Sequence, residues 1–196
     1  MSPTFRLVSL ALALGTTACG VSSASPAPPP APTAACPSLG KLAPPAVPPA
    51  LQPPPDATLM ARYRARGAQV YTCKATTGAA APFAWSLKAP DATLLDDGCK
   101  PIGTHFAGPT WKAAGDESAV VGMKLAEAPA PVAGAAAWLL LKATSTSGHG
   151  LMSSVVAVQR VDTTGGVPPA DHPCSAAAVG SELRVPYTAT YYFYKQ

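Results

Sequence analysis

The chain has 196 residues and a formal net charge of +4, from 14 Lys and Arg against 10 Asp and Glu. With 12% charged residues and no long basic run, the composition argues against a nucleic-acid-binding protein, and we expect no nucleic-acid partner. The apolar stretch near the start is too short for a permanent membrane-spanning helix, which needs about 20 apolar residues. These limits favour one folded domain behind an export segment.

Residues 1–18 have the pattern of an export signal. Arg6 is the only charged side chain among them, and a run of apolar residues leads to Cys19. The small residues before Cys19 resemble a bacterial lipobox, although Thr16 stands where that motif usually has leucine. We expect Cys19 to be lipidated and to anchor the protein at the outer membrane or on the periplasmic face. Ordinary signal-peptidase cleavage a few residues later, followed by secretion, is the alternative.

Residues 19–56 are rich in proline and poor in bulky apolar side chains. Of the 24 prolines in the chain, 13 lie between Ala24 and Asp56, and most of their neighbours are Ala, Ser and Thr. Such a segment buries too little apolar surface to offset the entropy of ordering it. We therefore expect a disordered linker over residues 19–56, partly in polyproline II conformation, and a single folded domain over residues 57–196.

The folded domain is expected to be all-β. Alternating or short apolar runs predict strands over residues 69–73, 138–143, 155–161 and 185–194, and a hairpin around the turn at residues 96–98. In the last of these strands Tyr187, Ala189, Tyr191 and Phe193 share one face, and Tyr192 and Tyr194 share the other. Turn residues separate about eight or nine short antiparallel strands, a pattern typical of a β-sandwich or a barrel-like domain.

Four cysteines remain once Cys19 is set aside: Cys36, Cys73, Cys99 and Cys174. An even number in an exported protein favours disulfide bonds. There is no C-x-x-C pair and the spacings are irregular, so we expect no metal site, and nothing in the sequence indicates a cofactor. Four cysteines allow three pairings. We favour Cys73–Cys174 together with Cys36–Cys99, which pins the end of the linker to the domain.

Three candidate ligand-binding residues lie close together in the sequence: His105, Trp111 and Asp116. An imidazole can ligate a metal, move a proton, or line a glycan subsite with Trp111. The alternative is a buried His105 that bonds a loop carbonyl and packs beside Phe106. Ser118 adds the third side chain of a hydrolase triad, but no Gly-x-Ser-x-Gly motif is present, so we assign no catalytic residue.

Arg160 is the fourth candidate. Arg160 and Asp162 lie on the same face if their strand is regular, shortly before Gly165–Gly166. They either contact an anion or a sugar, or form a surface ion pair that closes a hairpin.

A series of landmarks runs through nearly all of residues 57–196. They are Gly67–Cys73, Phe83–Trp85, Pro90–Leu94, His105–Trp111, Asp116–Ser118, Trp138–Leu141, Gln159–Pro168, Cys174 and Val185–Ala189. Their order and spacing resemble the DUF3455 family, exported proteins of bacteria and fungi with no established function. Members of that family carry cysteines matching Cys73 and Cys174, which implies this disulfide, whereas Cys36 and Cys99 look like additions. The resemblance implies a fold and an exported location, and almost no chemistry.

A looser series comprises Tyr71–Cys73, a strand with Phe and Trp, the Asp-Gly hairpin and Gly115–Ala119. It is similar to the small lipoprotein inhibitors of C-type lysozyme, β-barrels that place a loop in the cleft of the enzyme.

These observations favour an exported or lipid-anchored protein of the cell envelope that acts as a non-enzymatic binding module. We place its ligand at His105, Trp111, Asp116 and Arg160, and expect a cell-wall glycan or a protein as partner. An enzyme acting on envelope or extracellular glycan and a lysozyme-inhibitor-like lipoprotein are the alternatives.

Overall fold

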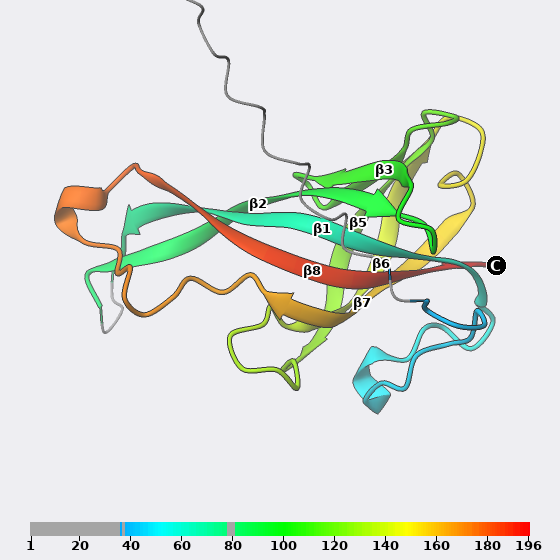
Figure 1. The fold of residues 1–196 in the computed structure, drawn as a ribbon, viewed down its shortest axis with the longest axis horizontal. Helices are drawn as coiled ribbons and strands as arrows, with labels where there is room; N and C mark the ends of the chain where they lie inside the picture. The colour runs from blue at the N-terminus through cyan, green and yellow to red at the C-terminus, as the bar shows by residue number, and fades with distance from the viewer. Residues whose placement is uncertain (1–35, 37, 78–80) are drawn as a thin grey trace, which may run out of the picture. The chain divides into compact units, whose positions relative to one another are not determined.

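The computed structural model describes residues 36, 38–77 and 81–196 (Figure 1). In this part of the chain eight antiparallel strands form one closed barrel, in which β8 returns to pair with β1. The elements are η1 (Pro49–Leu51), β1 (Thr58–Ala75), β2 (Phe83–Leu95), β3 (Pro101–Phe106), β4 (Thr110–Ala113), β5 (Ala119–Ala128), β6 (Trp138–Ser147), β7 (Val155–Gly165), η2 (Ala176–Ala178) and β8 (Glu182–Lys195). The all-β prediction is confirmed, with a barrel as the architecture. None of the helical segments in the described residues has the length and apolar character of a membrane-spanning helix.

The predicted hairpin is present between β2 and β3. Its turn is held by Asp96, whose Oδ1 accepts hydrogen bonds from the backbone N–H of Gly98 at 2.9 Å and of Lys100 at 2.8 Å. A carboxylate that accepts bonds from the following backbone amides favours such a turn. The turn thus fixes where β2 ends and where β3 begins.

β8 closes the barrel and has the alternation that the sequence predicts. It pairs with β1 over most of its length and with β7 on its other side. Tyr187, Ala189, Tyr191 and Phe193 are buried inside the barrel, in the main core cluster. Tyr192 and Tyr194 lie on the opposite face and pack in a second cluster with side chains of β7. Both faces of β8 are therefore buried over residues 189–194, whereas Pro186 and Thr188 are exposed.

The interior is layered along the barrel axis. Val158 of β7 pairs with Phe193 of β8, and two residues further along Arg160 pairs with Tyr191. The first layer is apolar, and the second brings a charged side chain into the interior. The Val158–Phe193 layer is thus filled by apolar core, whereas the next layer combines the charged Arg160 with the buried ring of Tyr191.

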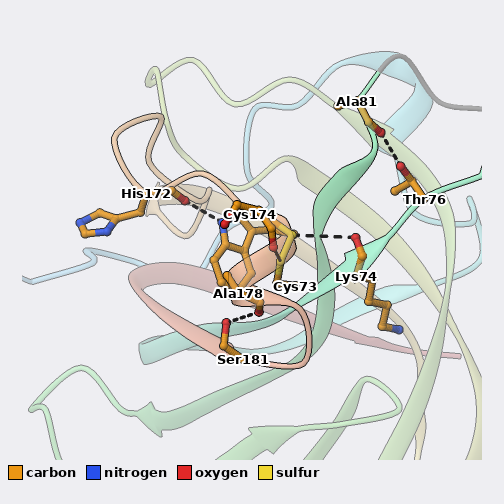
Figure 2. The surroundings of a disulfide bond; sticks show 10 residues. Cys73, Lys74, Thr76, Ala81, His172, Cys174, Ala178 and Ser181 are labelled. Atoms are coloured by element: carbon orange, nitrogen blue, oxygen red, sulfur yellow. Dashed lines mark hydrogen bonds between the residues drawn. A yellow bond between two sulfur atoms is a disulfide. The ribbon is translucent and has the colours of Figure 1, made fainter.

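β1, β2 and β8 continue past the barrel as a three-stranded sheet with β1 in the middle (Figure 1). The Cys73–Cys174 disulfide ties β1 to the segment before β8, with Cα atoms 5.4 Å apart. Figure 2 shows this bond beside His172, whose carbonyl oxygen accepts a hydrogen bond from Trp85 Nε1 at 2.7 Å. The Cys36–Cys99 bond is also present, so both favoured pairings are confirmed.

Residues 38–57 lie against the outside of the barrel. Leu51 is fully buried, and its carbonyl oxygen accepts a hydrogen bond from Gln159 Nε2 at 2.6 Å. Gln159 Oε1 in turn accepts one from the Tyr194 hydroxyl at 2.5 Å. The expectation of a disordered linker therefore needs correction for residues 38–56. Because the outer faces of β7 and β8 are apolar, a few apolar residues of this segment suffice to dock it.

The export signal (residues 1–18), Cys19 and the linker residues 20–35 and 37 lie outside the described residues.

Arg62 on β1 holds the start of this docked segment. Its Nη1 donates to the carbonyl oxygen of Leu39 at 2.8 Å, and its Nη2 donates to that of Gly40 at 2.8 Å. Arg62 also lies 3.4 Å from an Asp97 carboxylate oxygen, near the Cys36–Cys99 disulfide. A covalent bond and a charge-assisted hydrogen-bond cluster thus fix the same stretch of chain.

We expect Leu51→Ala to lower the free energy of unfolding by about 2–4 kcal/mol, because it removes a fully buried side chain and leaves a cavity. Leu42→Ala is the matched control, since Leu42 lies in the same segment but is 43% exposed and should change stability by less than about 0.5 kcal/mol. Urea denaturation followed by fluorescence measures both. Equal effects would contradict the docking of residues 38–57.

Candidate functional site

The β3–β4 hairpin is short and leaves an opening in the wall of the barrel. β2 pairs with β3 only through its last residues, Ala92–Leu95, and β4 pairs with β5 only through Ala119–Val121. In the described part of the chain, residues 83–91 of β2 and residues 123–128 of β5 therefore have no strand partner on the side facing the hairpin. A pocket of about 470 Å³ opens between these two edges and reaches the interior.

Every strand contributes to the pocket. Its lining includes Gln69 from β1, Pro90 from β2, His105 from β3, Trp111 from β4, Gly122 from β5, Leu139 from β6, Arg160 from β7 and Tyr191 from β8. The mouth of a barrel is a common place for a ligand site, and this volume falls in the range that small molecules occupy.

His105, Trp111 and Tyr191 form an aromatic cluster at the pocket. His105 and Trp111 are direct cross-strand partners on β3 and β4, and their rings stack with centroids 4.5 Å apart and planes 7° apart. Tyr191 packs edge-on against both rings, with centroids 5.0 Å and 5.4 Å away. All three side chains are at most 2% exposed, so the cluster gives one side of the pocket a rigid surface.

The imidazole of His105 is held neutral. Its Nδ1 lies 2.9 Å from the carbonyl oxygen of Thr110. Because a carbonyl only accepts, Nδ1 carries the hydrogen and Nε2 carries a lone pair. Burial lowers the pKa of His105 to about 3, and the nearby charge of Arg160 acts in the same direction. The alternative of a buried histidine that bonds a loop carbonyl and packs beside Phe106 is right about the burial. The carbonyl, however, belongs to Thr110 in β4, and the imidazole stacks on Trp111 and lines the pocket.

Two pocket residues carry buried N–H groups with no hydrogen-bond partner among the described residues, Gln69 Nε2 and Trp111 Nε1. Both side chains are at most 1% exposed. A buried donor left unpaired costs about 1–3 kcal/mol, and native structures contain few of them. Gln69 and Trp111 both line the pocket, but the two N–H groups are themselves buried, so a ligand acceptor reaches them only if the pocket wall adjusts.

Arg160 brings a positive charge to the same pocket. Its Nε and Nη2 donate to the carbonyl oxygen of Ala137 at 3.1 Å and 2.8 Å, and its guanidinium also lowers the pKa of the Tyr191 phenol. Within the described residues no ion pair forms on Arg160. Burial raises the pKa of the Tyr191 and Tyr187 phenols, and the Arg160 charge partly offsets this shift. The neutral phenols supply no counter-charge to the guanidinium, and the Glu127 carboxylate, whose pKa is lowered first by Lys124 and also by Arg160, is ion-paired with Lys124.

Asp116 does not join this site. Its Oδ1 accepts hydrogen bonds from the backbone N–H and the hydroxyl of Ser118, and its Oδ2 accepts one from the backbone N–H of Leu151 at 2.8 Å. These bonds lower the pKa of the Asp116 carboxyl, and the bond from the Ser118 hydroxyl has the largest effect. Asp116 therefore ties the β4–β5 turn to the loop before β7. Since Ser118 bonds Asp116 and His105 bonds Thr110, the three side chains do not form a triad.

Arg160 and Asp162 do not share a face, contrary to the expectation from a regular strand. The pairing of β7 with β8 is interrupted between Val161 and Thr164, and Asp162 has a φ of 51°. This left-handed residue turns the chain, so Asp162 is exposed while Arg160 lines the interior pocket. No ion pair joins the two residues in the described part of the chain.

Sequence reasoning did not select Gln69, Gly122 or Tyr191 as site residues. Gly122 makes room for the aromatic cluster, because a Cβ there would lie 3.0 Å from Cζ3 of Trp111. The alternation of β8 placed Tyr191 inside, but not at a pocket. Within residues 36, 38–77 and 81–196, no three His, Cys, Asp or Glu side chains are grouped so as to hold a metal ion.

The buried His105 predicts a specific dependence of stability on pH. Between pH 6.5 and about 3 the unfolded imidazole is protonated and the buried one is not. The unfolded chain then binds one more proton than the folded chain, so the free energy of unfolding falls as the pH falls, by up to about 1.4 kcal/mol per pH unit from this group. Above pH 7 His105 contributes no slope.

Urea denaturation at pH 4, 5, 6 and 7 tests this expectation by comparing the wild type with His105→Gln. The advantage of the wild type over the variant should shrink toward acid pH. His149→Gln, a change in an exposed loop, is the control and should run parallel to the wild type. A constant difference between wild type and His105→Gln would contradict the neutral, buried imidazole.

Comparison with known proteins identifies a family. No curated protein and no solved structure shows a significant match to the chain. The model of a family described as a protein of unknown function, DUF3455, matches residues 53–195. This range contains all eight strands of the described barrel and every residue that lines the pocket. The resemblance noted from the sequence is thereby confirmed, and the chain belongs to the DUF3455 family.

Proposed function

We propose that this protein is an exported, non-enzymatic binding protein whose barrel holds a small molecule in the pocket between β2 and β5. The observation that carries the proposal is the pocket itself, about 470 Å³ in volume, with unpaired N–H groups of Gln69 and Trp111 in its lining. The aromatic cluster of His105, Trp111 and Tyr191 supplies a rigid wall, and a preformed site loses little entropy when it binds.

The chemistry of the pocket supports binding more than catalysis. Its lining contains one carboxylate, Glu127, which is paired with Lys124, and a histidine whose pKa is lowered to about 3. A general acid or base works best with a pKa near the operating pH. Asp116, the other candidate acid, lies outside the pocket. These features argue against the alternative of a glycan-acting enzyme.

The lysozyme-inhibitor alternative relied on the Gly115–Ala119 segment. Asp116 and Ser118 in this segment are engaged by Leu151 and Met152 of the same chain. Because these contacts hold the segment within the fold, we favour the pocket over this loop as the binding element.

A fragment screen observed by NMR tests the proposed function. Fragments that bind should shift the side-chain amide signal of Gln69 and the indole N–H signal of Trp111, because these donors line the pocket. Met123→Trp places a bulky ring at the mouth of the pocket and should raise the dissociation constants of such fragments at least tenfold. Leu125→Trp is the matched control on the same exposed strand, since Leu125 does not line the pocket. Hits that leave the two donor signals unmoved, or no hits at millimolar concentration, would contradict the proposal.

We propose export with a lipid anchor at Cys19 as the location. The short apolar run before Cys19 supports it, and the two disulfide bonds are consistent with an oxidising compartment. Expressed in a bacterium, the wild type should incorporate labelled palmitate and sediment with membranes, whereas Cys19→Ser should do neither. Labelling that persists in Cys19→Ser would exclude the anchor at this position, and an unlabelled wild type that reaches the medium would favour ordinary cleavage.

A further inference from the structure

We propose that the ligand of this pocket is a small organic carboxylic acid, bound through its carboxylate by Arg160 and through an apolar body by the pocket walls. This inference rests on the proposed function, because it names the chemical class of ligand for the same pocket. It goes beyond the family, whose description assigns no ligand.

The charges around the pocket favour an anion. Three of the lining residues are cationic, Lys88, Lys124 and Arg160, and one is acidic, Glu127. The two lysines already have carboxylate partners, Glu182 and Glu127. In the described part of the chain Arg160 is the cation of this set that has no ion pair. An anionic ligand would supply its missing counter-charge.

The position of Arg160 strengthens its interaction with a counter-charge. Its charge acts on the buried His105 and on three tyrosines, Tyr71, Tyr187 and Tyr191, which are neutral at pH 7. It also acts on the Glu127 carboxylate, less than Lys124 does, and Lys124 is the ion-pair partner of Glu127. A cation that is partly withdrawn from water and faces neutral groups interacts more strongly with an anion than an exposed cation does. An anion bound at the partly buried Arg160 is therefore screened less by solvent than one on the surface.

The hydrogen-bond donors favour a carboxylate. A guanidinium has five N–H groups, and the contacts with Ala137 use two of them. The remaining N–H groups are available to a ligand, and a planar guanidinium matches a carboxylate. Gln69 and Trp111, whose buried side-chain N–H groups are unpaired among the described residues, also line the pocket. Two acceptor oxygens on one planar group complement this set of donors.

The rest of the lining favours an apolar body on the acid. Leu139, Leu141, Met123, Pro90 and Pro109 line the pocket together with the aromatic cluster. Such walls gain free energy from apolar contact and none from a hydrated inorganic ion. An aromatic or short branched carboxylic acid fits both the charged and the apolar parts.

The experiment compares benzoate with benzamide, two probes of nearly the same shape that differ in charge. Calorimetric titration of the wild-type protein should give benzoate a dissociation constant at least tenfold lower than that of benzamide. Inorganic phosphate, an anion without an apolar body, should bind at least tenfold more weakly than benzoate. Raising the salt concentration from 50 to 500 mM should weaken the binding of benzoate and leave the binding of benzamide unchanged.

Variants assign the effect to Arg160. Arg160→Met should abolish the preference for benzoate over benzamide, and Arg160→Lys, which keeps the charge but loses the fork, should retain only part of it. Arg66→Met is the matched control, because Arg66 is exposed and does not line this pocket. If Arg160→Met fails to fold, the comparison of probes in the wild type and in Arg160→Lys still decides the matter.

The outcomes separate the two proposals. Equal binding of benzoate and benzamide, or neutral fragments in the pocket with no binding of benzoate, would overturn the carboxylate assignment and leave the pocket as a binding site. A preference for benzoate that survives in Arg160→Met would also overturn it. Absence of any ligand that shifts the Gln69 and Trp111 signals would overturn both proposals.

Discussion

The closure of the barrel by β8 is the constraint on which the rest of the structure depends. β8 pairs with β1 on one side and with β7 on the other, so every second side chain must enter a narrow interior. At one layer this alternation places Phe193 beside Val158 in a filled core, and at the next it places Tyr191 beside Arg160. The same rule that builds the core therefore also brings a guanidinium and an aromatic cluster together.

The short β3–β4 hairpin converts this interior layer into an accessible pocket. If both strands were as long as β2, the edges of β2 and β5 would be paired and the wall would be complete. The opening is costly, because strand edges and the donors of Gln69 and Trp111 remain unpaired in the described chain. The proposed ligand would offset this cost, since a ligand that binds only the folded state adds to its stability.

The sequence predicts the parts of this structure that follow from local pattern, and it fails where the answer depends on distant partners. The alternation of β8, the hairpin at Asp96 and the two disulfides were predicted, and His105, Trp111 and Arg160 do lie at one pocket. The docking of residues 38–56 depends on an apolar outer face of β7 and β8. The composition of the proline-rich segment itself does not indicate that this face exists. The left-handed residue at Asp162 breaks the regular strand on which its pairing with Arg160 was expected.

The central claim is that Arg160 and the aromatic cluster form a site for a carboxylate with an apolar body. Its most direct test is a crystal structure of the protein soaked with 4-iodobenzoate, because the iodine marks the apolar end by anomalous scattering. We predict an iodine peak in the pocket between β2 and β5, with the carboxylate within hydrogen-bond distance of the Arg160 guanidinium. An empty pocket at a concentration that saturates the protein in solution, or iodine peaks only elsewhere, would contradict the claim.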